Sequence, residues 1–152
     1  MKRTIAFLVF SLLWLGVRAQ ETKEQIMEKR AREMHRVIKL SDQAQWKKFV
    51  AENYTQAFID RPMKSQVSKS DNSGATTEKK ETLGNAEGKA SMFQRLHNDF
   101  GDSKISSIKS NGDKVEMVLS AGDLSGTFNL KFSTAKPYLI DGLGIQVEAG
   151  NR

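Results

Sequence analysis

Apolar and polar residues alternate with a period of two along much of the C-terminal third of the chain. The apolar positions of the two clearest stretches are Val115, Met117, Leu119, Phe128, Leu130 and Phe132. Such an alternation places the apolar side chains on one face of an antiparallel strand and the polar ones on the other. The pattern therefore predicts a meander of strands that buries a single face.

Four strands are expected, over residues 105–109, 114–120, 124–133 and 138–148. Between the first two, Asn111-Gly112 is a strong signal for a tight hairpin. In the fourth strand the apolar residues change from even to odd numbers after Ile140, and a regular strand cannot bury both sets on one face. We therefore expect a β-bulge around Gly142 or Gly144, and we interpret both glycines through the backbone shape of that bulge.

Upstream of the strands the apolar spacing becomes that of helices. The charged segment 20–40 has one apolar stripe, formed by Met27, Ala31, Met34 and Ile38, which predicts an amphipathic helix loosely attached to the rest. A second helix begins at Asp42, which fits a capping box, and ends near Asp60 because Pro62 disfavours helix at the residue before it. A third helix is expected over residues 89–100.

The segment 63–88 has a different composition from its neighbours. It is rich in Ser, Thr, Lys, Asn and Gly and has few sizeable apolar residues. Such a segment cannot bury enough surface to offset the cost of ordering its backbone, so we predict a mobile polar loop. The chain is then a single α+β domain over residues 41–149, with amphipathic helices packed on one face of a curved four-stranded antiparallel sheet.

The N-terminus has the pattern of a secretory signal. Lys2 and Arg3 precede an almost unbroken apolar run of 11 residues, well below the roughly 20 residues that a membrane-spanning helix needs. Small residues at Val17 and Ala19 fit a cleavage site, so we interpret residues 1–19 as a signal peptide cut before Gln20. This predicts a secreted or periplasmic protein without stable membrane insertion.

The charge of the chain excludes few partners but weakens the case for nucleic acid. The net charge is +6, and cleavage after residue 19 would remove three basic residues and lower it to about +3, spread along the chain. The chain has no cysteine, which rules out disulfides, thiol nucleophiles and thiolate metal sites. With two histidines on different predicted helices, neither a metal nor another cofactor is expected.

Five residues are candidates for lining a pocket between the helices and the sheet: Trp46, Tyr54, Phe58, His97 and Asp141. The aromatic residues come from the second predicted helix, and His97 comes from the third. Asp141 lies beside the expected bulge, and bulges often re-aim a side chain next to a functional site. In a small isomerase, Asp141 could act as the base and Tyr54 as a hydrogen-bond donor, but the sequence names no catalytic residue.

The order of parts resembles a known family. The segments "FQRLHNDFG" (93–101) and "PYLIDGLGIQV" (137–147), with the preceding helices and the hairpin, resemble a cystatin-like or SnoaL-like accessory domain found ahead of secreted serine hydrolases of the β-lactamase type. The resemblance covers roughly residues 42–147. The segment 63–88 is longer and more polar than in that family, and no hydrolase domain follows. The resemblance implies a module without chemistry of its own.

Taken together, these features predict an exported, non-catalytic binding or accessory domain. Its partner would be a protein or a small apolar ligand, and oligomers could form through the sheet. The alternative is a small enzyme, either a cone-shaped isomerase or a hydrolase, that uses a cavity between helices and sheet. Ser133 and Lys136 match a Ser-x-x-Lys pattern of such hydrolases, but Ser133 would lie at a strand end rather than at the helix start that the mechanism needs.

Overall fold

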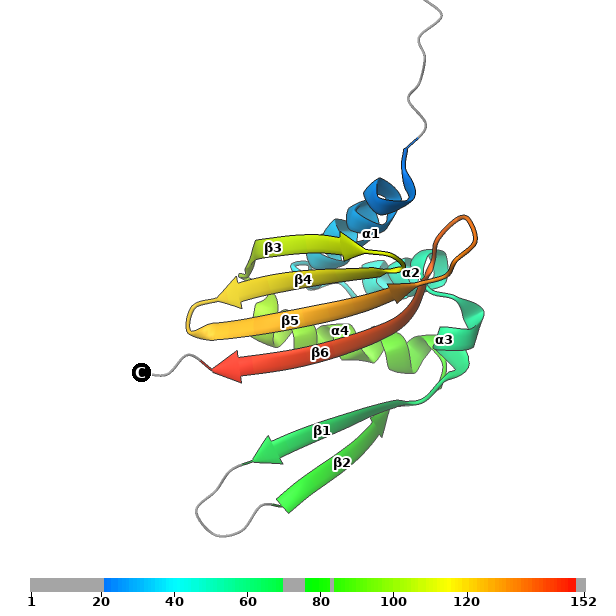
Figure 1. Ribbon diagram of the computed structural model, residues 1–152. Coiled ribbons are helices and arrows are strands. Elements are labelled where there is room, and N and C mark those ends of the chain that lie inside the picture. Colours follow the sequence, from blue (N-terminus) through cyan, green and yellow to red (C-terminus); the bar gives the residue numbers. More distant parts are fainter. Residues whose placement is uncertain (1–20, 70–75, 83, 150–152) are drawn as a thin grey trace, which may run out of the picture.

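An antiparallel sheet of four strands, covered on one face by helices, forms the body of the protein (Figure 1). The computed structural model describes residues 21–69, 76–82 and 84–149. The helices are α1 (Lys23–Ile38), α2 (Gln43–Asn53), α3 (Gln56–Asp60) and α4 (Ala86–Phe100). The strands are β1 (Met63–Lys69), β2 (Thr76–Thr82), β3 (Lys104–Asn111), β4 (Lys114–Ala121), β5 (Leu124–Phe132) and β6 (Ile140–Ala149). The predicted α+β class and antiparallel sheet are confirmed.

The main sheet has the strand order β3-β4-β5-β6, so each strand pairs with its neighbour in the sequence. Tight turns at Gly112 and Gly122 connect β3 to β4 and β4 to β5, and both glycines have the positive φ that such turns need. The predicted hairpin at Asn111-Gly112 is confirmed, with Asn111 paired to Lys114 across the turn. The strands β3 and β6 form the two edges of this sheet.

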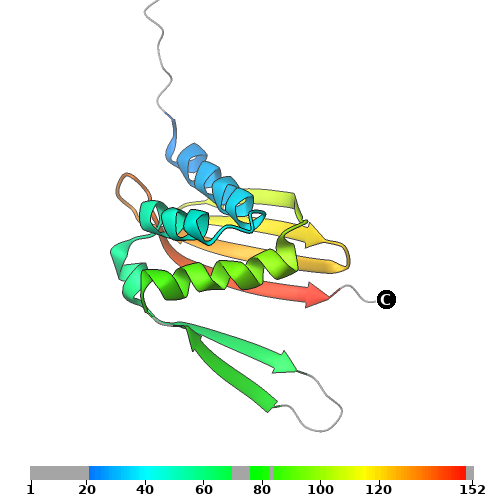
Figure 2. The ribbon, with the colours of Figure 1, turned by 180° about the vertical axis from the view of Figure 1, so that it is seen from behind.

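One hydrophobic core joins the inner face of the sheet to the helices. All six apolar positions of the alternating stretches, in β4 and β5, are at most 1% exposed. The apolar stripe of α1 is fully buried in the same cluster. The first helix is therefore part of the domain core, and the prediction that it is loosely attached is wrong. Figure 2 shows α1, α2 and α4 lying across the same face of the sheet.

The segment predicted as one helix from Asp42 to Asp60 is two helices. Asp42 caps α2, its carboxylate accepting from the backbone N–H groups of Ala44 and Gln45, but the contacts described for α2 do not include the return bond from the Gln45 side chain that a capping box needs. The chain becomes extended at Tyr54, and Thr55 then caps α3 by accepting from the N–H of Phe58. The sequence pattern missed this break because its apolar spacing continues through it.

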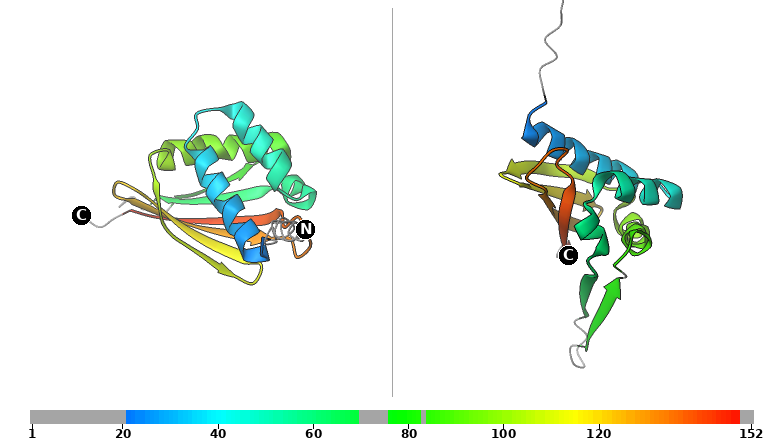
Figure 3. Two further views of the ribbon diagram at one scale, coloured as in Figure 1. Left: turned by 90° about the horizontal axis from the view of Figure 1, so that it is seen from above. Right: turned by 90° about the vertical axis from the view of Figure 1, so that its right-hand side faces the viewer.

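The segment predicted as a mobile polar loop contains regular structure. Within residues 63–88, β1 and β2 pair as an antiparallel hairpin, and α4 begins at Ala86. Backbone pairing between the two strands satisfies polar groups without requiring apolar side chains, which is why composition failed to predict it. Figure 3 shows the hairpin extending past the β6 edge of the main sheet, toward the side of the helices.

The predicted bulge in the last strand is confirmed. Phe132 pairs with Ile140 and Lys131 with Gly142, so Asp141 is the extra residue. The bulge restores the register and places Leu143 and Ile145 on the inner face, where they pack against the core. The interpretation of the glycines is wrong, because neither Gly142 nor Gly144 has a positive φ. A second bulge, between Ile105 and Ser107 of β3, was not predicted.

Candidate functional site

The five predicted pocket residues fall into two groups at different junctions of the fold. Tyr54, Phe58 and Asp141 lie where α2, α3 and β6 meet, and the backbone of Tyr54 forms a bridge with Ile140. Trp46 and His97 lie together where α2 and α4 meet the C-terminal end of α1, with ring centroids 6.2 Å apart.

The carboxylate of Asp141 has a structural partner. The hydroxyl of Thr55 donates to Asp141 Oδ1 over 2.7 Å and accepts from the N–H of Phe58 at 3.1 Å. The N–H of Thr55 donates to the carbonyl oxygen of Ile140 at 2.9 Å. Asp141 therefore completes a chain of hydrogen bonds that joins the start of α3 to the bulge of β6, which accounts for its position without catalysis.

Trp46 and His97 bind the backbone at the end of α1. The indole N–H of Trp46 donates to the carbonyl oxygens of Val37 and Leu40, at 3.1 and 3.0 Å. Nδ1 of His97 lies 2.9 Å from the carbonyl oxygen of Ile38. Because a carbonyl can only accept, Nδ1 is the donor in this contact. Both side chains satisfy carbonyls that a helix end leaves without partners.

His97 also lines a hollow on the surface of the protein. This hollow, of about 550 Å³, is wide open and mostly polar. Its lining residues are Lys39, His97, Asn98, Asp99, Gly101, Asp102, Ala121 and Gly122. It lies on the surface beside the β4–β5 turn, and its lining includes none of the aromatic residues predicted to share a pocket with His97.

Tyr54 is the predicted residue with an unexplained feature. Its side chain is 2% exposed, and its ring packs against Phe49 and Phe58 with centroids 5.8 and 5.0 Å away. Its hydroxyl is buried and has no hydrogen-bond partner among the described residues. Burial raises the pKa of this phenol. A buried phenol without a partner is uncommon and costs free energy.

Lys89 lies close to Phe58, which packs against Tyr54, and it was not predicted as a site residue. The residue is fully buried, and its Nζ donates to the carbonyl oxygen of Arg61 and lies 4.4 Å from the ring centroid of Phe58. Burial lowers the pKa of the amine to about 8. The signal was present in the sequence, because Lys89 precedes Phe93 by four residues on the buried stripe of α4.

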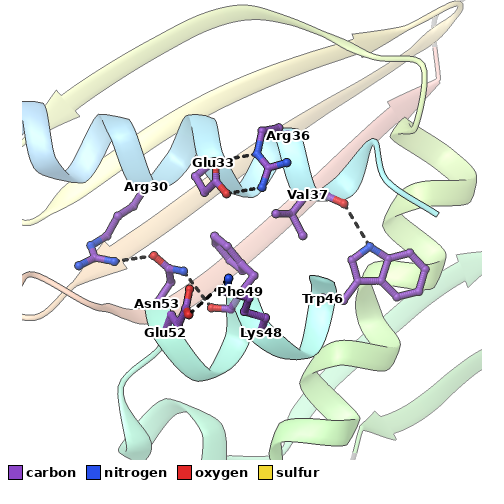
Figure 4. A network of polar contacts seen from close by, with 9 residues as sticks. All are labelled: Arg30, Glu33, Arg36, Val37, Trp46, Lys48, Phe49, Glu52 and Asn53. Atoms are coloured by element: carbon purple, nitrogen blue, oxygen red, sulfur yellow. Dashed lines mark hydrogen bonds and ion pairs between the residues drawn. The ribbon is translucent and has the colours of Figure 1, made fainter. Parts of the chain in front are cut away.

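Arg30 joins α1 to two other parts of the fold, and Figure 4 shows the first of these contacts, with Asn53. Its guanidinium donates to Oδ1 of Asn53 and, over 3.1 Å, to the carbonyl oxygen of Pro137 in the β5–β6 connection. Asn53 in turn donates to the carbonyl oxygen of Phe49 at 3.0 Å. Desolvation lowers the pKa of Arg30. These contacts position the β5–β6 connection over α1 and supply no reacting group.

An exposed apolar feature lies on β6. Val147 is 52% exposed, and it continues the inner row of Leu143 and Ile145, which are partly buried. On the outer face of the same strand, Gly142 and Gly144 contribute no side chain. From Gly142 onward the strand has no neighbour in the four-stranded sheet on its outer side.

Among residues 21–69, 76–82 and 84–149, no group of three or more His, Asp or Glu side chains could hold a metal ion. No helix in the described part of the chain is long and apolar enough to cross a membrane. Comparisons of the chain with protein-family models, curated proteins and solved structures find no match.

Proposed function

We propose that this chain is an exported, non-catalytic binding module that takes up an extended segment of a protein partner along the free edge of β6. The export follows from the signal pattern of residues 1–19. The accessory role agrees with the resemblance to cystatin-like and SnoaL-like domains. A strand added to a sheet edge gains affinity from main-chain hydrogen bonds and specificity from alternate side chains.

The main support for this proposal is that the β6 edge combines an apolar row with a backbone that has no strand partner in the described sheet. Leu143, Ile145 and Val147 form an inner apolar row, in which the first two are partly buried and the last is 52% exposed. The backbone beside them lacks a strand partner within the described sheet. A bound strand would cover the apolar row and satisfy the backbone groups in one step.

The candidate acid and base groups support binding over turnover. The carboxylate of Asp141 accepts from Thr55, and the imidazole of His97 donates to the Ile38 carbonyl. A catalytic base needs a lone pair aimed at a substrate position next to it. Here Asp141 and His97 belong to separate junctions, and each has a role in holding its junction together.

Site-specific photo-crosslinking tests the proposal. A photo-reactive phenylalanine analogue at position 147 is expected to give a covalent adduct with a protein when the full sequence is expressed in its own host. The same analogue at position 116, which is exposed on the outer face of β4, serves as the control and is expected to give none. Equal adducts at both positions, or none at 147, would overturn the proposal.

A second candidate function, a small-ligand site or small enzyme between helices and sheet, has one observation in its favour. The buried hydroxyl of Tyr54 has no partner among the described residues, and the amine of Lys89 lies over the adjoining ring of Phe58. A ligand that accepts a hydrogen bond would satisfy the phenol. Native mass spectrometry of the purified protein tests this, since a bound compound should be lost in Tyr54→Phe.

A further inference from the structure

We infer that the guanidinium of Arg30 is a binding site for a carboxylate that carries a short apolar chain. The site lies between α1 and α2, and no residue of β6 lines it, so its ligand is distinct from the strand proposed for the β6 edge. Three observations support the site: a cation without an ionic partner, a hollow beside that cation, and neighbouring carboxylates that are already paired.

Arg30 is a partly buried cation whose hydrogen bonds go only to neutral groups. Its terminal nitrogens donate to the side-chain oxygen of Asn53 and, over 3.1 Å, to the carbonyl oxygen of Pro137. Its Nε is buried and has no hydrogen-bond partner among the described residues. None of the ion pairs in the described part of the chain includes Arg30. Charged side chains that leave water are normally paired, so the guanidinium lacks the anion expected beside it.

The donors of this guanidinium are only partly used. Each terminal nitrogen has one acceptor in the structure. Because each carries two N–H groups, each keeps one further N–H that can donate to a ligand. The planar, forked guanidinium matches the two oxygens of a carboxylate better than it matches an anion that offers a single atom.

The side chain of Arg30 is held in place from two sides, by Asn53 and by the Pro137 carbonyl. The amide N–H of Asn53 donates to the carbonyl oxygen of Phe49 at 3.0 Å, which leaves its amide oxygen to accept from Arg30. Figure 4 shows the Arg30 side chain extending from α1 toward Asn53 at the end of α2. A cation that is already held loses little conformational freedom when a ligand binds, which favours affinity.

A hollow of about 340 Å³ lies beside this guanidinium. Its lining residues are Glu21, Ile26, Lys29, Arg30, Glu33 and Asn53. Its volume is at the small end of the range for small-molecule sites. Ile26, which is partly buried, and the aliphatic stem of Lys29 supply apolar surface. A ligand that fills the hollow therefore combines a carboxylate for Arg30 with a short apolar chain for Ile26.

The two carboxylates that line the hollow are paired with other cations. Glu33 accepts two hydrogen bonds from the guanidinium of Arg36, at 2.6 and 2.9 Å, and Figure 4 shows it turned toward Arg36. These hydrogen bonds hold the pKa of the Glu33 carboxyl below its usual value. Glu21 pairs with Lys29 over 3.1 Å. Of the cations that line the hollow, Arg30 is therefore the one left without a carboxylate.

Titrations monitored by NMR test the site, with the protein expressed from its full sequence and kept at low salt. The probe is hexanoate, and hexanamide serves as the uncharged ligand of the same shape. We expect hexanoate to shift the Nε–H resonance of Arg30 saturably, with a dissociation constant of about 1 mM, and hexanamide to bind at least about tenfold more weakly. Equal shifts with both ligands, or no saturable shift with hexanoate, would overturn the inference.

Variants separate the guanidinium from positive charge in general. Arg30→Gln should weaken hexanoate binding about tenfold or more, and Arg30→Lys about threefold or more, because lysine keeps the charge and loses the planar fork. Arg95→Gln, a matched change at an exposed residue of α4, should leave the dissociation constant unchanged. An Arg30→Gln variant that is folded by circular dichroism and binds hexanoate as tightly as the unaltered chain would overturn the inference.

Ile26→Ala keeps the test valid if the Arg30 variants unfold. It removes apolar contact with the chain of the ligand and leaves the guanidinium in place, so it should weaken hexanoate binding about fivefold. Unchanged binding of hexanoate to this variant would overturn the inference.

The same titration identifies the source of the carboxylate. Two sources share this chemistry, a free organic acid and the C-terminal residue of a polypeptide. Acetyl-glycyl-leucine is the probe for the second source, with its C-terminal amide as the control. Binding tighter than that of hexanoate assigns the site to a polypeptide C-terminus, and equal or weaker binding assigns it to a free acid. An amide that binds as tightly as the acetyl-glycyl-leucine carboxylate would overturn the inference.

Discussion

The hydroxyl of Thr55 donates to the carboxylate of Asp141 over 2.7 Å, although the two residues are 86 positions apart in the sequence. Thr55 begins α3, and Asp141 is the extra residue of the β6 bulge. Because the same hydroxyl also accepts from the N–H of Phe58, one side chain caps the helix and holds the bulge. The break between α2 and α3 therefore lies at the point where a hydrogen bond connects the helices to the β6 bulge.

Removing this carboxylate should destabilise the fold. Asp141→Ala is expected to lower the free energy of unfolding by about 1.5–3 kcal/mol, since it deletes a charge-assisted hydrogen bond and leaves the Thr55 hydroxyl without its acceptor. Asp141→Asn keeps an acceptor and should lose about half as much. Urea denaturation measures both, with the exposed Asp99→Ala as control, expected within about 0.5 kcal/mol of the unaltered chain. Equal losses for all three variants would contradict the role given to Asp141.

Much of the sheet could be predicted because its signals are local. The alternation of apolar and polar residues around Met117 and Phe128 indicates one buried face. After Ile140 the apolar positions change from even to odd numbers, which indicates an extra residue. The contact between Thr55 and Asp141 has no such signal, because it depends on how two distant elements meet. Its consequence, the break of the helix at Tyr54, was therefore missed as well.

The candidate site was harder to predict for the same reason. The aromatic residues Trp46 and Tyr54 were predicted to lie between the helices and the sheet, but sequence spacing cannot tell which junction each one occupies. The burial of Lys89 could have been predicted, because this residue lies on the apolar stripe of α4. It was missed because lysine is seldom buried without an ionic partner.

Replacing Tyr54 tests whether a bound molecule serves as the hydrogen-bond partner of its hydroxyl. If nothing binds it, Tyr54→Phe should be neutral or raise the free energy of unfolding by about 1 kcal/mol, because the variant no longer buries an unsatisfied polar group. Thermal and urea unfolding measure this, with Tyr138→Phe as control for the loss of a phenol at a partly buried position. A loss above about 1 kcal/mol confined to Tyr54→Phe would show that the hydroxyl has a bound partner and would favour a ligand site.

Lys89 should make the stability of the protein depend on pH. Its pKa is about 8 in the folded state and 10.5 in its ordinary state, because burial disfavours the charged amine. Between these values the unfolded chain binds more protons than the folded chain, so this residue makes stability rise with pH from about 8 to 10.5. Lys89→Met should remove that part of the slope, whereas the exposed Lys109→Met should keep it. Urea denaturation at pH 7, 8, 9 and 10 compares them, and identical slopes for all three proteins would contradict the assignment.

The glycines of the sheet should differ in how well each position tolerates a side chain. A Cβ at Gly126 of β5 would lie 2.5 Å from Cζ of the buried Phe100, so Gly126→Ala must displace core side chains and should cost about 1–3 kcal/mol. Gly142→Ala meets only an ordinary contact with Lys131, and it should stabilise the monomer by about 0.4–1 kcal/mol by restricting the unfolded chain.

A larger side chain at the same position extends this test. Gly142→Val should also fold, because β-branched residues favour strands and a Cβ at this position meets only the Cβ of Lys131, at 3.5 Å. Circular dichroism and urea denaturation measure this, with Gly126→Val as the contrasting variant that should unfold the protein. If Gly142→Val also unfolds the protein, the fold itself requires glycine at position 142.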